Sequence, residues 1–344
     1  MEKVLSVAVP CYNSQDYVRR AVNSLLQGKD RIEIIIVNDG STDGTAAIAE
    51  QYVKEYPDTV RLISKPNGGH GDAVMTGLAA ASAPYFRVLD SDDWLDRDSL
   101  LKLLDVLEGM KDPEKAADIV ITNYVYEKVN EGKSHPVNYR KTLPADRIFG
   151  WDEVGKFAIG SYILMHSATF RTELARSCGM KLPKHTFYVD HLYVCYPMTR
   201  VEKMYYLDTD LYRYFIGRED QSVNEKVMLS RMDQQIKVNR LLLYELDTAG
   251  ISNKAQKEYL FYYIEIVTLA TVSFLLRLGT KEDEEKVQAF LDEIQENRPD
   301  FYEWITTGPF TRHPMGTLRT LPKGVVYPIY RFCYKAARRL VCFN

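Results

Sequence analysis

The sequence EIIIVNDGSTDGT, residues 33–45, contains the clearest structural signal in the chain. Four successive apolar residues, Ile34 to Val37, form a run without polar alternation, which is typical of a strand covered on both faces. Asn38 to Ser41 then read as a turn, and Ser41 or Asp43 can cap a helix that continues to Val53. A buried strand followed by a tight turn and a helix is the repeating unit of a parallel α/β sheet.

The same unit recurs on both sides of this stretch. Strands are predicted at residues 5–10, 33–39, 60–65, 85–90 and 118–128, and helices at 14–27, 72–81 and 98–109. This alternation predicts a doubly wound, mostly parallel sheet. A further strand is expected at 203–217, and helices follow. We therefore expect a catalytic domain at 1–225, with a nucleotide-binding half (1–95) and an acceptor half (96–225), and an appended helical region at 226–344.

Composition narrows the protein class. The chain has 344 residues, of which 46% are hydrophobic and 26% charged, as in ordinary globular proteins. Its five cysteines are scattered and none forms a C-x-x-C pair, which argues against a disulfide framework and a structural zinc and favours a cytoplasmic location. The apolar stretch 259–279 approaches membrane-spanning length, but Glu265 interrupts it, so we expect a buried helix.

Polar or Gly-rich segments follow four of the predicted strands, at 10–13, 38–41, 67–71 and 90–93. Ligands of doubly wound sheets bind at the carboxyl ends of the strands. The last segment lies in VLDSDDW (88–94), which crowds three carboxylates into four positions. A solvated turn explains such crowding, and so does a divalent cation that bridges carboxylates to a diphosphate. Because all four segments lie at strand ends, we favour the cation.

Residues 4–94 resemble the inverting glycosyltransferases of family 2, nucleotide-sugar enzymes with the GT-A fold. The matching pieces occur in the expected order: VAVPCYNSQDYVRRAVNSLL, EIIIVNDGSTDGT, KPNGGHGDAVMTGL and YFRVLDSDDWL. The resemblance extends more loosely over 160–225. It implies a GT-A type fold and a sugar donor linked to a nucleoside diphosphate, usually UDP.

The resemblance also implies roles for individual residues. Asp39 would accept a hydrogen bond from the base, and Asp92, with Asp90, would hold Mn²⁺ or Mg²⁺ beneath the diphosphate. Asp93 is expected to be structural, capping the turn that follows it. The residues expected to bind the nucleotide sugar are Pro10, Tyr12, Asn13, Asp39, Gly40, Ser41, Asn67, Gly69, Asp90, Ser91, Arg213 and Arg218.

Inversion requires a base that removes the proton of the acceptor hydroxyl. In the family it heads a helix, and FYVDHLYVCYPM places Asp190 there, with Val189 replacing the commoner Glu. Asp190 is also a plausible helix cap, and both roles are compatible. We assign acceptor contacts to Trp94 and His191.

The third matching piece departs from the family pattern. Family members often carry Arg and Asn where this chain has Val74 and Met75. This puts in doubt which groups help to hold the diphosphate. His70 either compensates for them or is a surface residue in a turn.

Residues 312–344 form a basic, aromatic tail, and no acidic residue follows Trp304. This composition suits a helix on an anionic membrane surface, and equally a packed helix with a solvated basic face. The remainder of the chain is acidic, which opposes a nucleic-acid role.

The sequence thus predicts a metal-dependent inverting glycosyltransferase that adds one sugar from a UDP-sugar to a cell-surface glycan or lipid-linked oligosaccharide precursor. The Q-x-x-R-W element and multiple membrane spans of processive family members are not found. The alternatives are a nucleotidyltransferase and a catalytically silent nucleotide-sugar binding protein. The first is less favoured because the first strand ends in Pro-Cys-Tyr-Asn instead of a long Gly-rich basic loop, and no G-x-G-x-x-G supports a dehydrogenase.

Overall fold

The structure is a computed structural model of the chain. It describes residues 2–112, 114, 116–158, 160–217, 230–276, 280–307, 315, 324–325 and 327–329. The chain divides into two compact units: Met1–Lys156 with Ile163–Gly217, and Phe157–Tyr162 with Arg218–Asn344. The predicted membrane-contacting tail, 312–344, lies outside the described residues except for the few positions given above.

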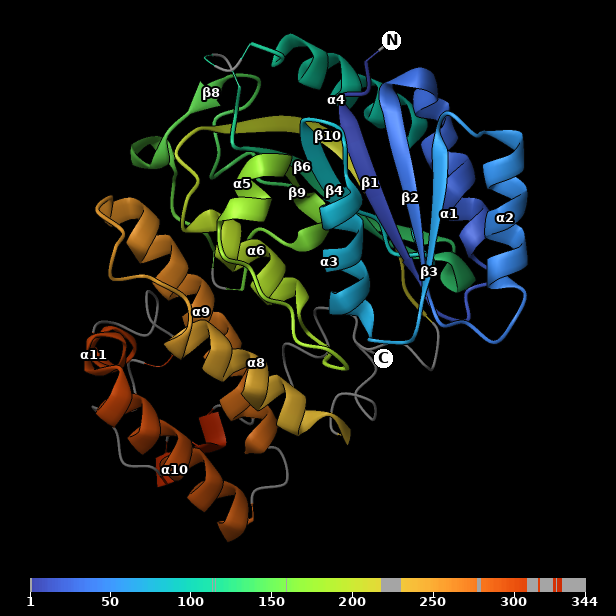
Figure 1. Cartoon of the computed structure of the whole chain (residues 1–344). Helices are drawn as coiled ribbons and strands as arrows, with labels where there is room; N and C mark the ends of the chain where they lie inside the picture. Colours follow the sequence, from blue (N-terminus) through green and yellow to red (C-terminus); the bar gives the residue numbers. More distant parts are fainter. Residues whose placement is uncertain are drawn as a thin grey trace. The chain divides into compact units, whose positions relative to one another are not determined.

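In the first unit, the described strands form one ten-stranded sheet with the order β3-β2-β1-β4-β9-β6-β10-β5, in which β7 pairs with β6 and β8 with β10 (Figure 1). The strands are β1 Leu5–Cys11, β2 Ile32–Asp39, β3 Val60–Lys65, β4 Tyr85–Val88, β5 Trp94–Leu95, β6 Ile119–Lys128, β7 Lys133–Val137, β8 Ile148–Phe149, β9 Ala168–Arg171 and β10 Met204–Phe215. The helices are α1 Val18–Leu25, α2 Thr45–Glu55, α3 His70–Ala80, α4 Arg97–Gly109, α5 Thr172–Ser177 and α6 Asp190–Met198.

The pairing of β1 with β2 and β4, of β2 with β3, and of β6 with β10 is parallel. The predicted GT-A type fold, a mostly parallel α/β sheet with an appended helical region, is confirmed. The sequence did not predict β9, which lies antiparallel between β4 and β6. This strand matters for the site because the chain that leads into it carries His166.

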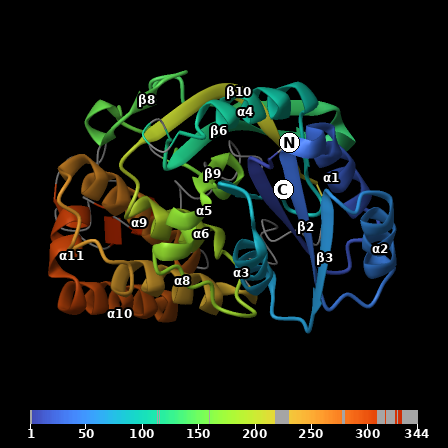
Figure 2. The ribbon, with the colours of Figure 1, turned by 45° about the horizontal axis from the view of Figure 1, so that its top comes forward.

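Helices cover both faces of the sheet, with α1 and α2 on one side and α3, α5 and α6 on the other (Figure 2). Strand side chains alternate between the faces: Leu5, Val7 and Val9 pack in one core cluster with α1, α2 and α4. Ala8 points to the opposite face, where a Cβ on Gly77 of α3 would lie only 2.4 Å from the Ala8 Cβ. Helix α3 therefore lies almost in backbone contact with β1, which fixes the position of its first residue, His70.

The second unit is helical. Its helices are α8 Met232–Tyr244, α9 Lys254–Leu275, α10 Lys281–Asn297 and α11 Pro299–Thr306. Helix α9 is long and apolar enough to cross a membrane, but 61% of its most apolar window is buried inside the structure, which is typical of a core helix. Asn239 of α8 bonds to Thr268 and Thr271 of α9, at 3.1 and 3.0 Å, so a buried polar layer fixes how these two helices align.

Candidate functional site

The ends of β1 and β2 are joined by hydrogen bonds. The backbone N–H of Asn13 donates to Ser41 Oγ (3.0 Å), and Asn13 Oδ1 accepts from the backbone of Thr42 (2.8 Å). Gly40 has a φ of 73°, and a Cβ there would lie 2.8 Å from the backbone nitrogen of Asn67. Only glycine fits this position, because the backbone is left-handed and a second segment approaches closely.

Asp39 organises the Gly-rich turn that follows β3. Its Oδ1 accepts from Lys65 Nζ (2.6 Å) and the Gly68 N–H (2.9 Å), and its Oδ2 accepts from the Gly69 N–H (2.7 Å). The Asn67 side chain returns a bond to the Asp39 carbonyl (2.9 Å). The predicted base-reading carboxylate is therefore also the anchor of the turn, and its side chain is only 3% exposed.

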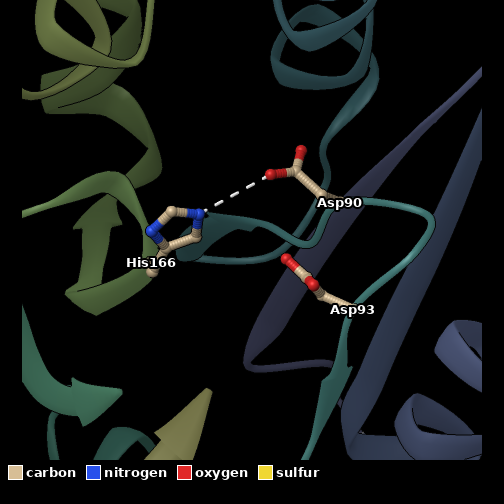
Figure 3. A group of neighbouring side chains, drawn as sticks. All are labelled: Asp90, Asp93 and His166. Atoms are coloured by element: carbon tan, nitrogen blue, oxygen red, sulfur yellow. Dashed lines mark ion pairs between the residues drawn. The ribbon is translucent and has the colours of Figure 1, made fainter. Parts of the chain in front are cut away.

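Asp90, in the turn after β4, lies between two histidines. Its Oδ1 is 2.8 Å from His70 Nε2, and its Oδ2 is 3.7 Å from His166 Nε2 (Figure 3). The adjacent Ser91 hydroxyl contacts the Ser14 hydroxyl at 2.8 Å, which ties this turn to the end of β1. The four polar segments that the sequence placed at strand ends therefore meet in one network.

The charges in this network shift the titration of its members. Burial alone would raise the pKa of Asp90, but the charges of His70 and His166 and the His70 hydrogen bond outweigh burial and hold that pKa well below its usual range. Burial opposes protonation of His70, yet Asp90, together with the charges of Asp190 and Asp92, raises the pKa of the imidazole. Asp90 is thus a carboxylate at neutral pH.

Asp93 has a different role from its neighbours. It is fully buried, and it accepts from the Tyr212 hydroxyl (2.6 Å) and from the backbone of Phe215 (2.8 Å). Burial and the charges of Asp92 and Asp90 raise its pKa well above the usual range. Asp93 therefore anchors β10 to this turn, whereas the residue that caps the following helix, α4, is Asp96. The expectation of a structural role fits this position, and both printed hydrogen bonds of the Asp93 side chain go to β10.

His166 was not identified from the sequence. Its ring stacks on Tyr214 (centroids 4.5 Å apart) and lies 4.6 Å from Tyr212, while its Nδ1 is buried without a hydrogen-bond partner among the described residues. Arg87, fully buried in β4, donates to the His166 carbonyl and to Thr169. An isolated histidine in LMHSATF gives no periodic signal, so only the unpredicted strand β9 explains its place.

Asp190 is the first residue of α6. The segment before it packs on the Gly-rich turn, because the His185 N–H donates to the Gly68 carbonyl (2.8 Å) and a Cβ on Gly69 would lie 2.9 Å from the His185 nitrogen. His191 follows in α6, where burial lowers its pKa against the opposing charge of Asp190. The segment that leads to the predicted base thus contacts the same turn as Asp39 and Asp90.

Several predicted residues lie apart from this network or outside the described chain. Arg213 pairs with Glu127 (2.9 Å) and Asp96 (3.4 Å), so its guanidinium is already engaged by carboxylates. Trp94, the predicted acceptor contact, packs against Arg20, whose guanidinium lies 4.0 Å from the centroid of the Trp94 ring. Arg218 is outside the described residues. Of the two remaining donor-site candidates, Pro10 is buried within β1 and Tyr12 is 54% exposed.

Asp90, Asp93 and His166 bring ligand atoms within 4.8 Å of one another. Because Asp93 already accepts two hydrogen bonds, Asp90 and His166 are the better-placed pair. Their 3.7 Å separation fits two ligands of one ion, which lie about 3 to 4 Å apart when each bond is about 2.1 Å. Asp92 is half-buried on the same turn, and its backbone carbonyl accepts from Arg20 (2.5 Å). The Asp90 carboxylate and the His166 imidazole fit a divalent cation, whereas Asp92, the predicted ligand, is not among the three residues whose ligand atoms are grouped.

Comparison with known proteins agrees with this arrangement. A family model described as glycosyl transferase family 2 matches residues 6–172. Residues 6–172 therefore form a family 2 glycosyltransferase domain. The match runs from β1 through β9, so it includes the Asp39, Asp90 and His166 positions, whereas Asp190 lies beyond it.

Glycosyltransferase GlyA of Streptococcus pneumoniae serotype 4 is 29% identical over 225 residues, which cover 62% of this chain and 31% of GlyA. The chain spans between 31% and 42% of the length of the first three curated relatives that it matches.

Two solved proteins share the fold over nearly the whole chain. S. aureus TarS 1-349 superposes with a TM-score of 0.66 at 18% identity, covering 97% of this chain and 92% of that one; its complex with UDP-GlcNAc gives 0.62 at 15% identity and the same coverage. The mannosyltransferase PcManGT from Pyrobaculum calidifontis, in complex with GDP-Man and Mn²⁺, gives 0.51 at 16% identity over 96% of this chain and 84% of that one.

Proposed function

We propose that this chain is a metal-dependent, inverting glycosyltransferase that transfers one sugar from a UDP-sugar to a hydroxyl of a cell-surface glycan or lipid-linked oligosaccharide precursor. The observation that carries this proposal is the position of the Gly-rich turn. Through Asp39 and His70 it contacts the carboxylates expected to bind the donor, and through His185 it contacts the segment that leads to Asp190. The proposed donor site and the proposed base would thus share one structural support.

Each group has a defined task in this proposal. Asp39 and the loops at Asn13 and Ser41 bind the nucleotide, and Asp90, Asp92 and His166 hold Mn²⁺ or Mg²⁺. When bound, the ion neutralises charge that develops on the departing diphosphate. Asp190 accepts the proton of the acceptor hydroxyl as it attacks the anomeric carbon from the side opposite the nucleotide. The bound nucleotide sugars of TarS and PcManGT, which share the fold, support a nucleotide-sugar donor.

The first experiment measures release of free nucleotide by the full chain. The donor panel contains UDP-GlcNAc, UDP-glucose, UDP-galactose and GDP-mannose, each with Mn²⁺, with Mg²⁺ or with EDTA. We expect one UDP-sugar to be hydrolysed faster than the others and EDTA to abolish its turnover. Turnover that persists in EDTA would contradict the metal dependence, and UDP binding without turnover would favour the silent binding protein.

The second experiment tests the base. Asp190→Asn keeps the shape of the side chain but cannot accept the proton, so transfer should fall by at least a hundredfold while UDP binding stays unchanged. The matched control is Asp58→Asn, an exposed aspartate in the turn before β3. Full activity of Asp190→Asn would contradict the assignment. The anomeric configuration of the product, read by NMR, tests inversion directly.

The location of the enzyme is also a proposal. A cytoplasmic protein whose basic tail contacts the inner leaflet would meet a lipid-linked acceptor there. Full-length chain should sediment with anionic liposomes, and a truncation at Thr311 should not. Equal sedimentation of both would end the membrane part of the proposal.

A further inference from the structure

His70 occupies a junction that its sequence position did not reveal. It is the first residue of α3, its side chain is 34% exposed, and its Nε2 lies 2.8 Å from Asp90 Oδ1. The two residues before it donate backbone hydrogen bonds to Asp39, and the Gly68 carbonyl accepts from His185. The imidazole is therefore held by a turn that two other segments, the end of β2 and the chain at His185, fix in place.

The two oxygens of Asp90 have unequal surroundings. Oδ1 has a hydrogen bond of ordinary length from His70, whereas Oδ2 lies 3.7 Å from His166, which is longer than a hydrogen bond. The terminal torsion of an aspartate is broad, so either oxygen could face the ligand if no donor held one of them. In the structure, Oδ2 is the oxygen nearer to His166.

We propose that His70 is a positioning residue: by donating to Oδ1, it fixes the rotation of the Asp90 carboxylate so that Oδ2 faces the metal and the donor. This role deepens the proposed function and rests on it. The bond needs only an N–H at Nε2, which the neutral ring supplies in one tautomer. His70 itself does not touch the reacting atoms, so its effect passes through Asp90.

Val74 and Met75, which are apolar, lie further along α3. In this chain, the first turn of α3 contributes through His70 instead, which faces Asp90 directly. Val74 is buried in the packing between α3 and the sheet.

The experiment compares three variants of the full chain in UDP binding, measured by calorimetry across a Mn²⁺ titration. His70→Ala removes the donor, His70→Gln supplies an amide N–H in its place, and His135→Ala changes an exposed histidine of β7 as the matched control. Loss of one hydrogen bond to a charged group should raise the Mn²⁺ concentration needed for half-maximal UDP binding about tenfold in His70→Ala. His70→Gln should recover most of this loss, and His135→Ala should match the wild type.

Recovery by glutamine, with unfolding temperatures near that of the wild type, would support positioning, because a packing role would not distinguish the metal titrations of alanine and glutamine. Equal metal dependence of His70→Ala and wild type would overturn the inference, and so would equal impairment of the alanine and glutamine variants. A wild type that binds UDP with Mn²⁺ but releases none from any donor would overturn the proposed transferase while leaving this comparison valid. A wild type that binds no UDP would overturn both.

Discussion

Replacing Asp39 by asparagine tests whether the end of β2 and the Gly-rich turn act as one unit. The carboxylate accepts three hydrogen bonds, from Lys65 Nζ at 2.6 Å, Gly68 N at 2.9 Å and Gly69 N at 2.7 Å. Asparagine has a single acceptor oxygen. If that oxygen faces Lys65 and Gly68, the new amide N–H₂ faces the Gly69 N–H, and two donors oppose each other.

The free-energy cost follows from these contacts. A hydrogen bond to a charged group contributes about 1.5 to 3 kcal/mol, and a buried donor without a partner adds a further penalty. Lys65 keeps its ion pair with Asp72 at 2.6 Å, so the Lys65 ammonium still has an anionic partner. The full penalty for breaking a buried ion pair therefore does not apply. We therefore expect Asp39→Asn to lower the free energy of unfolding of the first unit by about 3 kcal/mol.

Urea unfolding read by hydrogen exchange in peptides from β2 and β3 isolates the first unit from the helical one. A loss of about 3 kcal/mol should shift the midpoint of these peptides by about 1 M urea. The control is Asp72→Asn, which removes the outer partner of Lys65 but leaves all the bonds of Asp39, and should cost about 1 kcal/mol. An unchanged midpoint for Asp39→Asn would refute the reasoning, because it would mean that the turn does not depend on the carboxylate.

Three further predictions concern other parts of the chain. Burial raises the pKa of Glu265 to about 8, so its contribution to stability is full below about pH 4.5 and is lost as the pH rises through about 8. Calorimetry from pH 5 to 8.5 should show that the free energy of unfolding of the wild type declines by about 4 kcal/mol and that Glu265→Gln lacks this decline. Parallel curves for the two proteins would exclude this origin. Gly77→Ala would place a Cβ 2.4 Å from the Cβ of Ala8 in β1 and should lower the free energy of unfolding in urea by about 1 to 3 kcal/mol. In the control Gly109→Ala the new Cβ meets nothing within 4 Å, so the loss should be far smaller. Equal effects of the two variants would show that α3 shifts freely. Tyr212→Phe removes a hydroxyl that donates to the buried Asp93 at 2.6 Å and should lower the free energy of unfolding, measured by thermal unfolding, by about 1 to 3 kcal/mol. Tyr193→Phe should not, because the buried Tyr193 hydroxyl has no hydrogen-bond partner among the described residues. The reverse order would contradict the hydrogen-bond assignment.

The strand ends were predictable because of a geometric rule. In a parallel sheet the carboxyl ends of neighbouring strands lie at one edge, so polar residues that follow each strand must be near one another. Asp39 is the last residue of β2 and Asp90 follows β4, and both contact the turn after β3. The hydroxyl contact between Ser14 and Ser91 joins the segments that follow β1 and β4. The rule needs only strand positions, which the apolar runs supply.

The position of His166 depends on strand pairing that no local sequence pattern encodes. His166 reaches Asp90 because β9 is inserted antiparallel between β4 and β6, and β9 has only four residues. Arg87 lies in a strand and would normally face solvent, yet it is buried and bonds to the His166 carbonyl. Burial lowers its pKa to about 10, so it stays a cation at neutral pH. Such long-range contacts become visible only when the strand order is known.

Gly40 and Gly69 explain why the loops after β2 and β3 can be both tight turns and parts of the proposed ligand-binding site. A Cβ on Gly40 would lie 2.8 Å from the Asn67 nitrogen, and one on Gly69 would lie 2.9 Å from the His185 nitrogen. At both positions the backbone has positive φ, and another segment approaches the backbone itself. Backbone contacts of this kind do not adjust as flexible side chains do, so they hold the Gly-rich turn against the end of β2 on one side and the segment before Asp190 on the other. The turn geometry therefore links the end of β2, with Asp39, to the segment that precedes Asp190.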